Sequence, residues 1–244
     1  MIRCNFRPAQ GVLALGCVAA MTFGANAQNL LANPSLEIDG PGFVVFEDWI
    51  QFNNVFQDES VEVLAHEGLQ SAKMFGQFTP EGQSDNGLQQ VVPVIGGDTY
   101  TLTGWTFVPS GDAIVALDPM GSAGGGAYGH LALGIIDFLD AGGLVIGGSS
   151  VEVQVHESGV TATDQWVEFS VAGTAPANAM DAQVTLLLIQ WDLAPGAIFW
   201  DDMSLEAGAG EPQPCNPADL AEPFGVLNFS DVIAFLGFFG AGCD

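Results

Sequence analysis

Basic residues are almost absent from this 244-residue chain, which has 3 Lys and Arg against 29 Asp and Glu. Arg3 and Arg7 lie near the N-terminus, so Lys73 is the only Lys or Arg after residue 27. Without the first 27 residues, which contain no acidic residue, the formal charge is 1 minus 29, or −28. A field of this sign repels nucleic acid, anionic lipid and sulfated polymers, and it favours neutral ligands and divalent cations.

Long apolar runs are also missing after residue 27, where no stretch reaches the roughly 20 apolar residues of a membrane-spanning helix. The first 27 residues have the pattern of an export signal: a basic start, an apolar run over residues 11–23, and Ala25-Asn26-Ala27 as a cleavage motif. We expect cleavage after Ala27 and a secreted or cell-surface product. Leu15-Gly16-Cys17 fits a lipoprotein processing site poorly.

Cysteine is scarce as well. Cys4 and Cys17 fall within the expected signal, which leaves Cys215 and Cys243 to form a disulfide in an oxidising compartment. Residues 208–214 ahead of this pair, GAGEPQP, have the composition of a linker. We therefore predict a domain boundary near residue 208, followed by a small, disulfide-closed and partly helical unit over residues 215–244.

No convincing amphipathic helix occurs between residues 28 and 207. This segment instead contains short β-like runs separated by Gly-rich or turn-like residues. The clearest runs are 49–56, 60–64, 71–75, 88–92, 99–108, 130–139, 165–171, 183–190 and 197–205. This pattern predicts an all-β domain, a two-sheet antiparallel β-sandwich of the jelly-roll type.

Two adjacent carboxylates, Asp201 and Asp202, interrupt the last of these runs. A strand places them on opposite faces, so Asp201 is expected on the core face with Phe199, Met203 and Leu205. A buried carboxylate must be paired, hydrogen-bonded or bound to a metal, because desolvation alone is costly. Since almost no cation is available in the chain, a bound calcium ion is the leading candidate for the partner.

Four segments in order carry a resemblance to known proteins. Residues 29–37, NLLANPSLE, resemble the NLLxNPSFE opening of jelly-roll carbohydrate-binding modules of families 4, 9 and 22. Residues 99–105, TYTLTGW, are similar to the YTLSxW strand of those modules, and residues 166–169, WVEF, to their W-x-x-F strand. Residues 199–205, FWDDMSL, are similar to their closing YIDDVSL. The resemblance covers nearly all of residues 28–207.

The resemblance implies a structural calcium ion, because in such modules the opening Glu and the closing Asp lie close together and help to hold one. Carried over, it implies Glu37 and Asp201 as ligands, with Asp39 and Asp202 as helpers. Calcium suits carboxylate and carbonyl oxygens on flexible segments. The alternative is that Glu37 and Asp201 only accept backbone hydrogen bonds.

Modules of this fold bind sugars on aromatic platforms, where pyranose CH groups stack on a ring and polar neighbours bind the hydroxyls. Trp105 lies on the more polar face of its predicted strand, and Trp166 alternates with Glu168 and Ser170. Trp191 ends a predicted strand, and Tyr128 lies in a Gly-rich loop. We expect these four aromatic residues to form the carbohydrate-binding site; half-buried packing in the sandwich is the alternative.

The C-terminal residues 215–236, CNPADLAEPFGVLNFSDVIAFL, closely resemble the short GC-type dockerin module of secreted bacterial proteins. The resemblance implies attachment or sorting through a cohesin-like or cell-surface partner. With Gly225 as the loop glycine, Leu220, Glu222 and Phe224 occupy positions where a calcium loop has Asp or Asn, so the match to a calcium site is incomplete.

No complete active site is present in the sequence. Glu37 and Asp39 begin the E-x-D-x-x-E pattern of some β-sandwich glycosidases, but residue 42 is Gly. His66, His130 and His156 lack metal-ligand spacing and are interpreted as surface or core residues. The sequence thus predicts a secreted, non-catalytic protein that binds a neutral polysaccharide or oligosaccharide. The alternatives are a structural or adhesive cell-surface or matrix protein without a sugar ligand, and a hydrolase with an atypical site.

Overall fold

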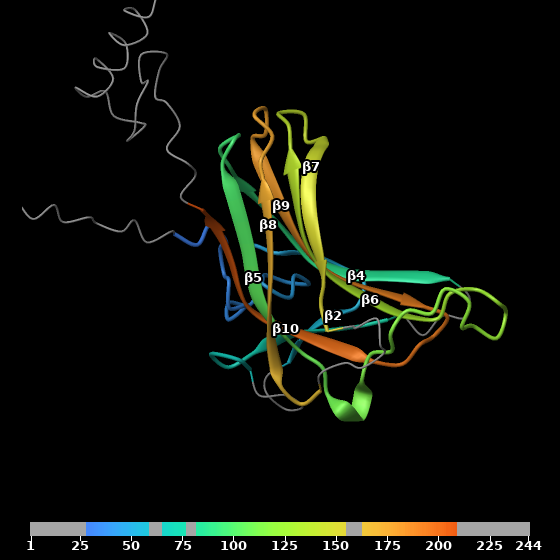
Figure 1. Cartoon of the computed structure of the whole chain (residues 1–244). Coiled ribbons are helices and arrows are strands. Elements are labelled where there is room, and N and C mark those ends of the chain that lie inside the picture. Colours follow the sequence, from blue (N-terminus) through green and yellow to red (C-terminus); the bar gives the residue numbers. More distant parts are fainter. Residues whose placement is uncertain (1–27, 59–64, 77–81, 155–162, 209–244) are drawn as a thin grey trace, which may run out of the picture.

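Ten strands and one short 3-10 helix make up the computed structural model, which describes residues 28–58, 65–76, 82–154 and 163–208 (Figure 1). The elements are β1 (Ile50–Phe52), β2 (Val55–Asp58), β3 (Ser71–Phe75), β4 (Gln83–Pro93), β5 (Thr99–Phe107), η1 (Ser110–Asp112), β6 (Gly129–Leu139), β7 (Val145–Glu152), β8 (Trp166–Thr174), β9 (Asp181–Trp191) and β10 (Ala197–Ala207). No helix among these residues is long and apolar enough to cross a membrane.

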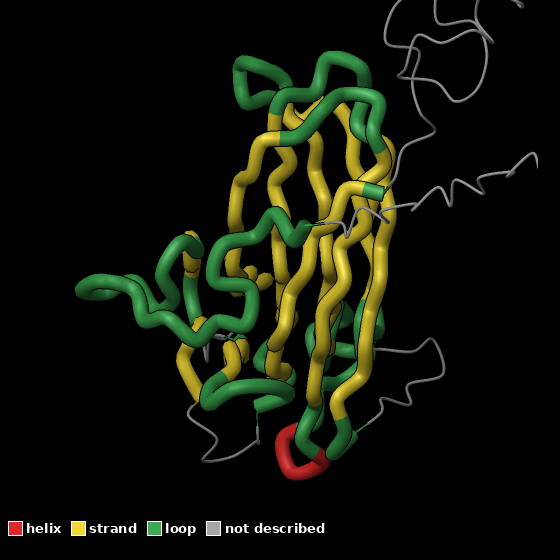
Figure 2. Tube along the Cα trace, turned by 90° about the vertical axis from the view of Figure 1, so that its left-hand side faces the viewer, coloured by secondary structure: helices red, strands yellow, loops and turns green. Residues whose placement is uncertain are grey.

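The strands form two antiparallel five-stranded sheets, which confirms the predicted all-β sandwich. Sheet I has the order β1-β4-β9-β6-β7, and sheet II has the order β2-β3-β10-β5-β8. Strands β3 to β6 pair with β10 to β7 in reverse order, as β3·β10, β4·β9, β5·β8 and β6·β7. A long hairpin folded over into two sheets gives this order, which is that of a jelly roll. The strands lie in two layers with η1 at one end (Figure 2).

Most of the predicted strands match observed ones, with two differences. The run 49–56 is two strands, because Asn53 takes a left-handed backbone with a φ of 55° and the chain crosses from sheet I to sheet II there. Strand β7 was not predicted, since Gly147 to Ser150 give it no apolar alternation. The predicted run 60–64 lies outside the described residues, as do residues 1–27, His156 and the expected module at 215–244 with Cys215 and Cys243.

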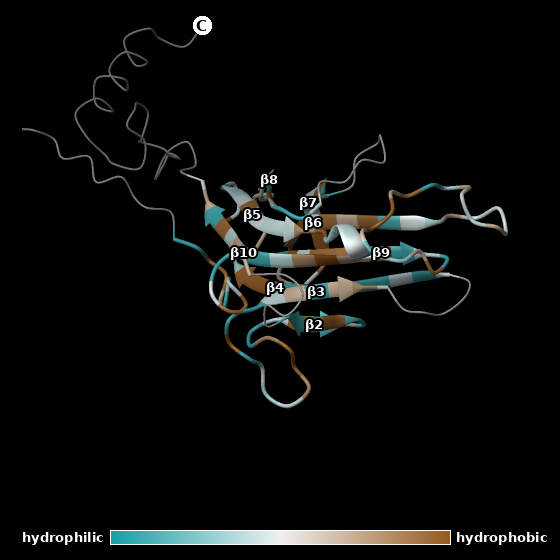
Figure 3. Cartoon of the chain, turned by 90° about the horizontal axis from the view of Figure 1, so that it is seen from below, coloured by the Kyte–Doolittle hydropathy of each residue, from teal (hydrophilic) through white to brown (hydrophobic). Residues whose placement is uncertain are grey.

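One continuous hydrophobic core lies between the sheets. The inner face of β5 contributes Tyr100 and Leu102, which are almost fully buried, and β8 contributes Phe169 and Val171. The alternation predicted for these two strands is therefore confirmed, since Trp105 and Trp166 fall on the outer face of sheet II. Hydrophobic residues are concentrated along β6, β9 and β10 (Figure 3).

The opening segment of the domain runs beside its closing strand. Asn29 forms an isolated bridge with Glu206, and Leu30 N donates to Leu205 O at 2.8 Å. Further along, Met203 N donates to Pro34 O at 2.9 Å. The first and last segments of the jelly roll are thus held together, which brings Glu37 and Asp201 to the same edge of the molecule through the loop described below.

Candidate functional site

A β-bulge in β10 determines where Asp201 points. Its pairing with β5 shifts between Asp201 and Ser204, and Asp202 within the bulge has a φ of 49°. Ahead of the bulge, Phe199 and Asp201 face outward from sheet II; beyond it, Met203 and Leu205 belong to the core between the sheets. The prediction that Asp201 shares a face with Met203 and Leu205 is therefore wrong, because the extra residue reverses the alternation.

Asp201 is nevertheless fully buried, as expected for its sequence context. His66 N donates to Asp201 Oδ2 at 2.8 Å, and Asp202 N donates to Asp201 Oδ1 at 2.8 Å. Burial, and then the neighbouring charge of Asp202, raise the pKa of Asp201 to about 7. The outer face of sheet II therefore contains a carboxyl group that is partly protonated at neutral pH.

The loop of residues 66–70 is anchored by carboxylates at both ends. Glu37 Oε1 accepts hydrogen bonds from Leu69 N at 2.9 Å and from Gln70 N at 3.0 Å. Gln70 Nε2 also donates to Asp39 Oδ1 at 3.2 Å. At the other end, Asp201 accepts from His66 N. Glu37 and Asp201 thus accept backbone hydrogen bonds, which is the alternative weighed from the sequence.

Calcium binding at these carboxylates stays a prediction. In the parts of the chain that are described, no three side chains of His, Cys, Asp or Glu are grouped so as to hold a metal ion. The carboxylates of Asp201 and Asp202 are adjacent, however, and the only Lys or Arg outside residues 1–27 is Lys73. A divalent cation would relieve the charge repulsion between two such carboxylates.

Trp105 and Trp166 lie close together and both contact His66. The rings of His66 and Trp105 are stacked, with centroids 4.1 Å apart and planes 15° from parallel. Trp166 meets His66 edge-on at 5.8 Å. His66 Nδ1 also lies 2.6 Å from Asp202 Oδ2. One face of Trp105 is therefore covered by an imidazole ring that a carboxylate holds in place.

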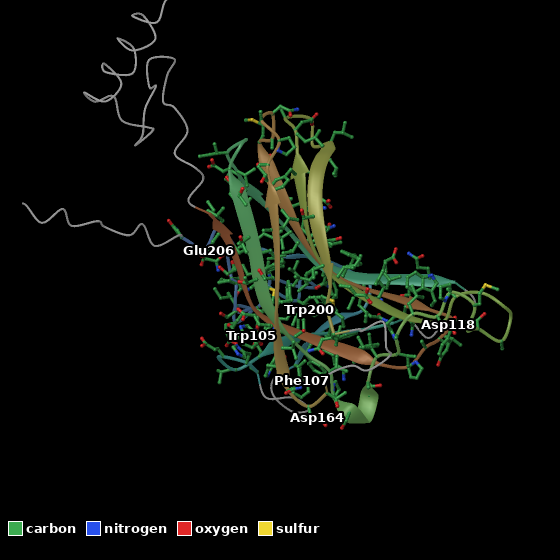
Figure 4. The ribbon with its side chains drawn as sticks, viewed as in Figure 1. Trp105, Phe107, Asp118, Asp164, Trp200 and Glu206 are labelled. Atoms are coloured by element: carbon green, nitrogen blue, oxygen red, sulfur yellow. The ribbon has the colours of Figure 1, made fainter. Side chains whose placement is uncertain are left out.

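A second aromatic group continues along the outer face of sheet II. Phe107 packs against Trp166 at 5.5 Å between centroids and meets Phe199 edge-on at 6.3 Å. Trp105 and Phe107 follow one another on the same side of β5 (Figure 4). Phe199 is completely buried. These contacts make this face a packed aromatic layer.

His130 occupies the core, in agreement with the interpretation from the sequence. It is completely buried, and Val115 N donates to its Nδ1 at 3.1 Å. Burial lowers the pKa of His130 to about 4, so the ring is neutral.

Trp191 lies away from the other two tryptophans, on the outer face of sheet I. It is the last residue of β9 and pairs with Gln83 of β4 and Gly129 of β6. It is half-buried and lines an open groove of about 570 Å³. We call this the Trp191 groove; its lining is Gly82, Gln83, Ser122, Ala123, Gly124, Gly126, Ala127, Trp191 and Asp192. The structure therefore divides the predicted aromatic platform between two opposite faces.

Tyr128 lies beside this groove without lining it. Its backbone pairs with Asp118 through two hydrogen bonds of 2.8 and 2.9 Å, which close the Gly-rich loop over residues 118–128. Figure 4 shows Asp118 at the far end of β4, β6 and β9, well away from Trp105. Tyr128 thus belongs to the same end of the molecule as Trp191.

Sequence reasoning did not identify Gln83 and Asp192 as site residues. Gln83 reaches Trp191 only through the register of β4 and β9. Asp192 and Leu193 both have positive φ values, 50° and 59°. Two consecutive non-glycine residues in this conformation are unusual, and such strain is often found at functional sites. In the sequence, the one feature that could have indicated Asp192 as a site residue was its position directly after Trp191.

No protein-family model matches the chain, and no curated protein matches it either. Among solved structures, the enzymatically active domain of tailspike protein 4 from bacteriophage CBA120 is similar at 12% identity and a TM-score of 0.50. The match covers 74% of this chain but only 21% of the tailspike chain. This likeness concerns the fold alone.

Two carbohydrate-binding modules also align with the chain. A family 61 module in complex with beta-1,4-galactotriose aligns at 18% identity and a TM-score of 0.42, over 75% of this chain and 100% of the module. A family 22 xylan-binding domain from Paenibacillus barcinonensis aligns at 17% identity and a TM-score of 0.42, over 74% of this chain and 95% of that domain.

Proposed function

We propose that this protein is non-catalytic and binds a neutral polysaccharide or oligosaccharide in the Trp191 groove. The observation that carries the proposal is the position of Trp191, half-buried, beside Gln83 and Asp192 in an open groove of about 570 Å³. A tryptophan ring stacks on the CH groups of a pyranose, and amide and carboxylate groups bind its hydroxyls. The sequence resemblance to carbohydrate-binding modules supports the same ligand class.

The outer face of sheet I continues the groove with suitable chemistry. Its half-buried and exposed apolar side chains are Ile50, Phe52, Leu131, Leu133, Ile135, Leu187 and Ile189. The polar groups among them include Gln89, Thr185 and Asp137. Gln89 Nε2 donates to Thr185 Oγ1 at 3.2 Å. Burial raises the pKa of the Asp137 carboxyl group. A chain of several sugar units needs such a face, in which apolar patches alternate with hydroxyl-binding groups.

Trp105 and Trp166 are assigned a smaller role in this proposal than the sequence predicts. His66 covers one face of Trp105, and Trp166 packs against Phe107. The stacked face of Trp105 is therefore not available to a sugar, and Trp166 is in contact with both His66 and Phe107. We therefore assign the glycan to sheet I.

The remaining parts of the proposal rest on sequence. Residues 1–27 direct export, and residues 215–244, closed by a disulfide between Cys215 and Cys243, attach or sort the protein through a cohesin-like or cell-surface partner. A structural calcium ion is held by Glu37 and Asp201, with Asp39 and Asp202 as helpers, next to the 66–70 loop.

Affinity electrophoresis tests the glycan site. The purified protein is run through gels that contain a neutral glucan, xylan, mannan or galactan, and at least one of these polymers should retard it. Trp191→Ala should remove the retardation, whereas Trp105→Ala, matched in chemistry but located on sheet II, should keep it. Retardation that survives Trp191→Ala refutes this site. A parent protein that no polymer retards favours the structural or adhesive alternative.

A further inference from the structure

A second, smaller pocket lies at the same end of the sandwich on the other side of β9. It has a volume of about 210 Å³ and lies between the end of β3, η1 and the β9–β10 connection. Gln190 and Trp191 are consecutive, so their side chains leave β9 on opposite faces. Trp191 lines the groove on sheet I, and Gln190 lines this pocket.

The wall of the pocket contains an amide group with spare hydrogen-bonding capacity. Gln190 is 3% exposed. Its Nε2 donates to Ala194 O at 2.7 Å, and the amide oxygen Oε1 of such a group can accept up to two hydrogen bonds. Gln190 Oε1 is therefore available as an acceptor for a hydroxyl group that enters the pocket.

The shape of the pocket depends on a glycine opposite this amide. A Cβ atom placed on Gly76 would lie 1.8 Å from the amide carbon of Gln190. Any larger residue at position 76 would push the amide away from its position beside Ala194. Gly76 therefore permits the close approach of β3 to Gln190.

Charged and aromatic groups complete the wall. Lys73, the only Lys or Arg of the described residues, places its ammonium 5.4 Å from the centroid of Phe199 and 6.0 Å from that of Phe75. Asp112, at the end of η1, is exposed and also lines the pocket. A cation, a carboxylate and an amide oxygen around an aromatic ring match the alternating donors and acceptors of a polyhydroxylated ring.

We propose that this pocket binds a single neutral sugar unit, either a free monosaccharide or the end of a glycan chain. The volume is below the range of drug-sized ligand sites, which suits one ring and no more. The strongly negative charge of the protein disfavours an acidic sugar of the same size. The site is separate from the Trp191 groove, and its ligand is assigned from its own lining.

Calorimetric titration of the full protein with glucose, galactose, mannose, xylose and glucuronate tests the proposal. At least one neutral sugar should bind, and more tightly than glucuronate. Asp112→Asn should weaken that binding by ~10-fold or more, because it removes a charged acceptor for sugar hydroxyls. Asp112 is exposed on a short turn, so this variant keeps the fold. Glu206→Gln, an equal change of charge at the far end of β10, should leave the affinity unchanged.

The outcomes separate this proposal from the one for the groove. Binding of a monosaccharide that survives Trp191→Ala and is lost in Asp112→Asn establishes the pocket even if no polymer is retarded in gels. Unchanged affinity in Asp112→Asn overturns it, as does stronger binding of glucuronate or no binding of any neutral sugar.

Discussion

His66 lies flat against Trp105, with ring centroids 4.1 Å apart, and its Nδ1 lies 2.6 Å from Asp202 Oδ2. This one side chain joins the 66–70 loop to β5 and to the bulge of β10. Its own backbone N–H also donates to Asp201. Trp105, one of the four aromatic residues predicted to bind sugar, therefore supports a loop that contacts the carboxylates of Asp201 and Asp202.

Replacing His66 by Ala should lower the free energy of unfolding by about 1–2 kcal/mol, since both an aromatic contact and a partly buried hydrogen bond to Asp202 are lost. His66→Phe keeps the stacking on Trp105 and removes only the pair with Asp202, so it should lose less. Urea denaturation followed by tryptophan fluorescence measures the difference. Equal stability of His66→Ala and the parent would show that the loop does not depend on this contact.

The buried Asp201 should make stability depend on pH. Its pKa in the folded protein is about 7, above the ordinary 3.8. Between roughly pH 4 and 7 the folded state therefore binds more protons than the unfolded state, so stability falls as pH rises through this window. Asp201→Asn should reduce this pH dependence. The free energy of unfolding of the variant minus that of the parent should be at least about 1 kcal/mol larger at pH 7 than at pH 4. Thermal melts in calcium-free buffers across this range give the comparison, and an unchanged slope in Asp201→Asn contradicts the assignment.

The alternation of apolar and polar residues, together with the Gly-rich or turn-like residues between the runs, was sufficient to predict the sandwich and most of its strands. The inner and outer faces of β5 and β8 follow directly from the order of their residues, because both strands are regular. In β10 the same rule fails after Asp201, since a bulge adds one residue and no pattern in the sequence marks it. Strand β7 has no hydrophobic alternation, and it forms because β6 provides a partner edge.

The candidate site was predictable only in part, because it depends on register. The sequence singled out four aromatic residues but could not show that Trp191 and Trp105 end on different sheets. Gln83 and Gln190 are ordinary amides in the sequence. The pairing of β4 with β9 places Gln83 beside Trp191, and the close approach of Gly76 and Ala194 gives Gln190 its neighbours. The resemblance implies that Glu37 and Asp201 lie close together, but the 66–70 loop, from whose backbone N–H groups both of them accept hydrogen bonds, has no signal in the sequence.

Trp200 offers a test of how the core is packed. It is completely buried, contacts Phe169 edge-on at 5.7 Å, and its Nε1 has no hydrogen-bond partner among the described residues. Trp200→Ala should cost about 3–5 kcal/mol because it leaves a large cavity. Trp200→Phe should cost clearly less, since it keeps much of the ring and removes a buried N–H that is not hydrogen-bonded. Similar losses in the two variants, measured by urea denaturation, would show that Trp200 Nε1 is satisfied in the protein.

Calcium should raise the melting temperature, and the effect should grow with pH. A cation binds the ionised form of Asp201. Because the pKa of Asp201 is about 7, the carboxyl group must first lose a proton at lower pH, which weakens calcium binding there. At a calcium concentration of about 100 times the dissociation constant, linkage predicts a gain of about 2.7 kcal/mol. Melts at pH 6 and pH 8, with calcium, magnesium or a chelator, measure this effect.

Variants identify the ligands of that ion. Glu37→Gln and Asp201→Asn should each abolish the calcium-dependent shift, whereas Glu206→Gln, which removes one carboxylate at the end of β10, should retain it. Because both ligand variants also alter the anchors of the 66–70 loop, the informative quantity is the shift between calcium and chelator for each variant, not its absolute melting temperature. A parent protein that melts at the same temperature in calcium and in chelator at pH 8 would leave Glu37 and Asp201 with backbone hydrogen bonds as their whole role.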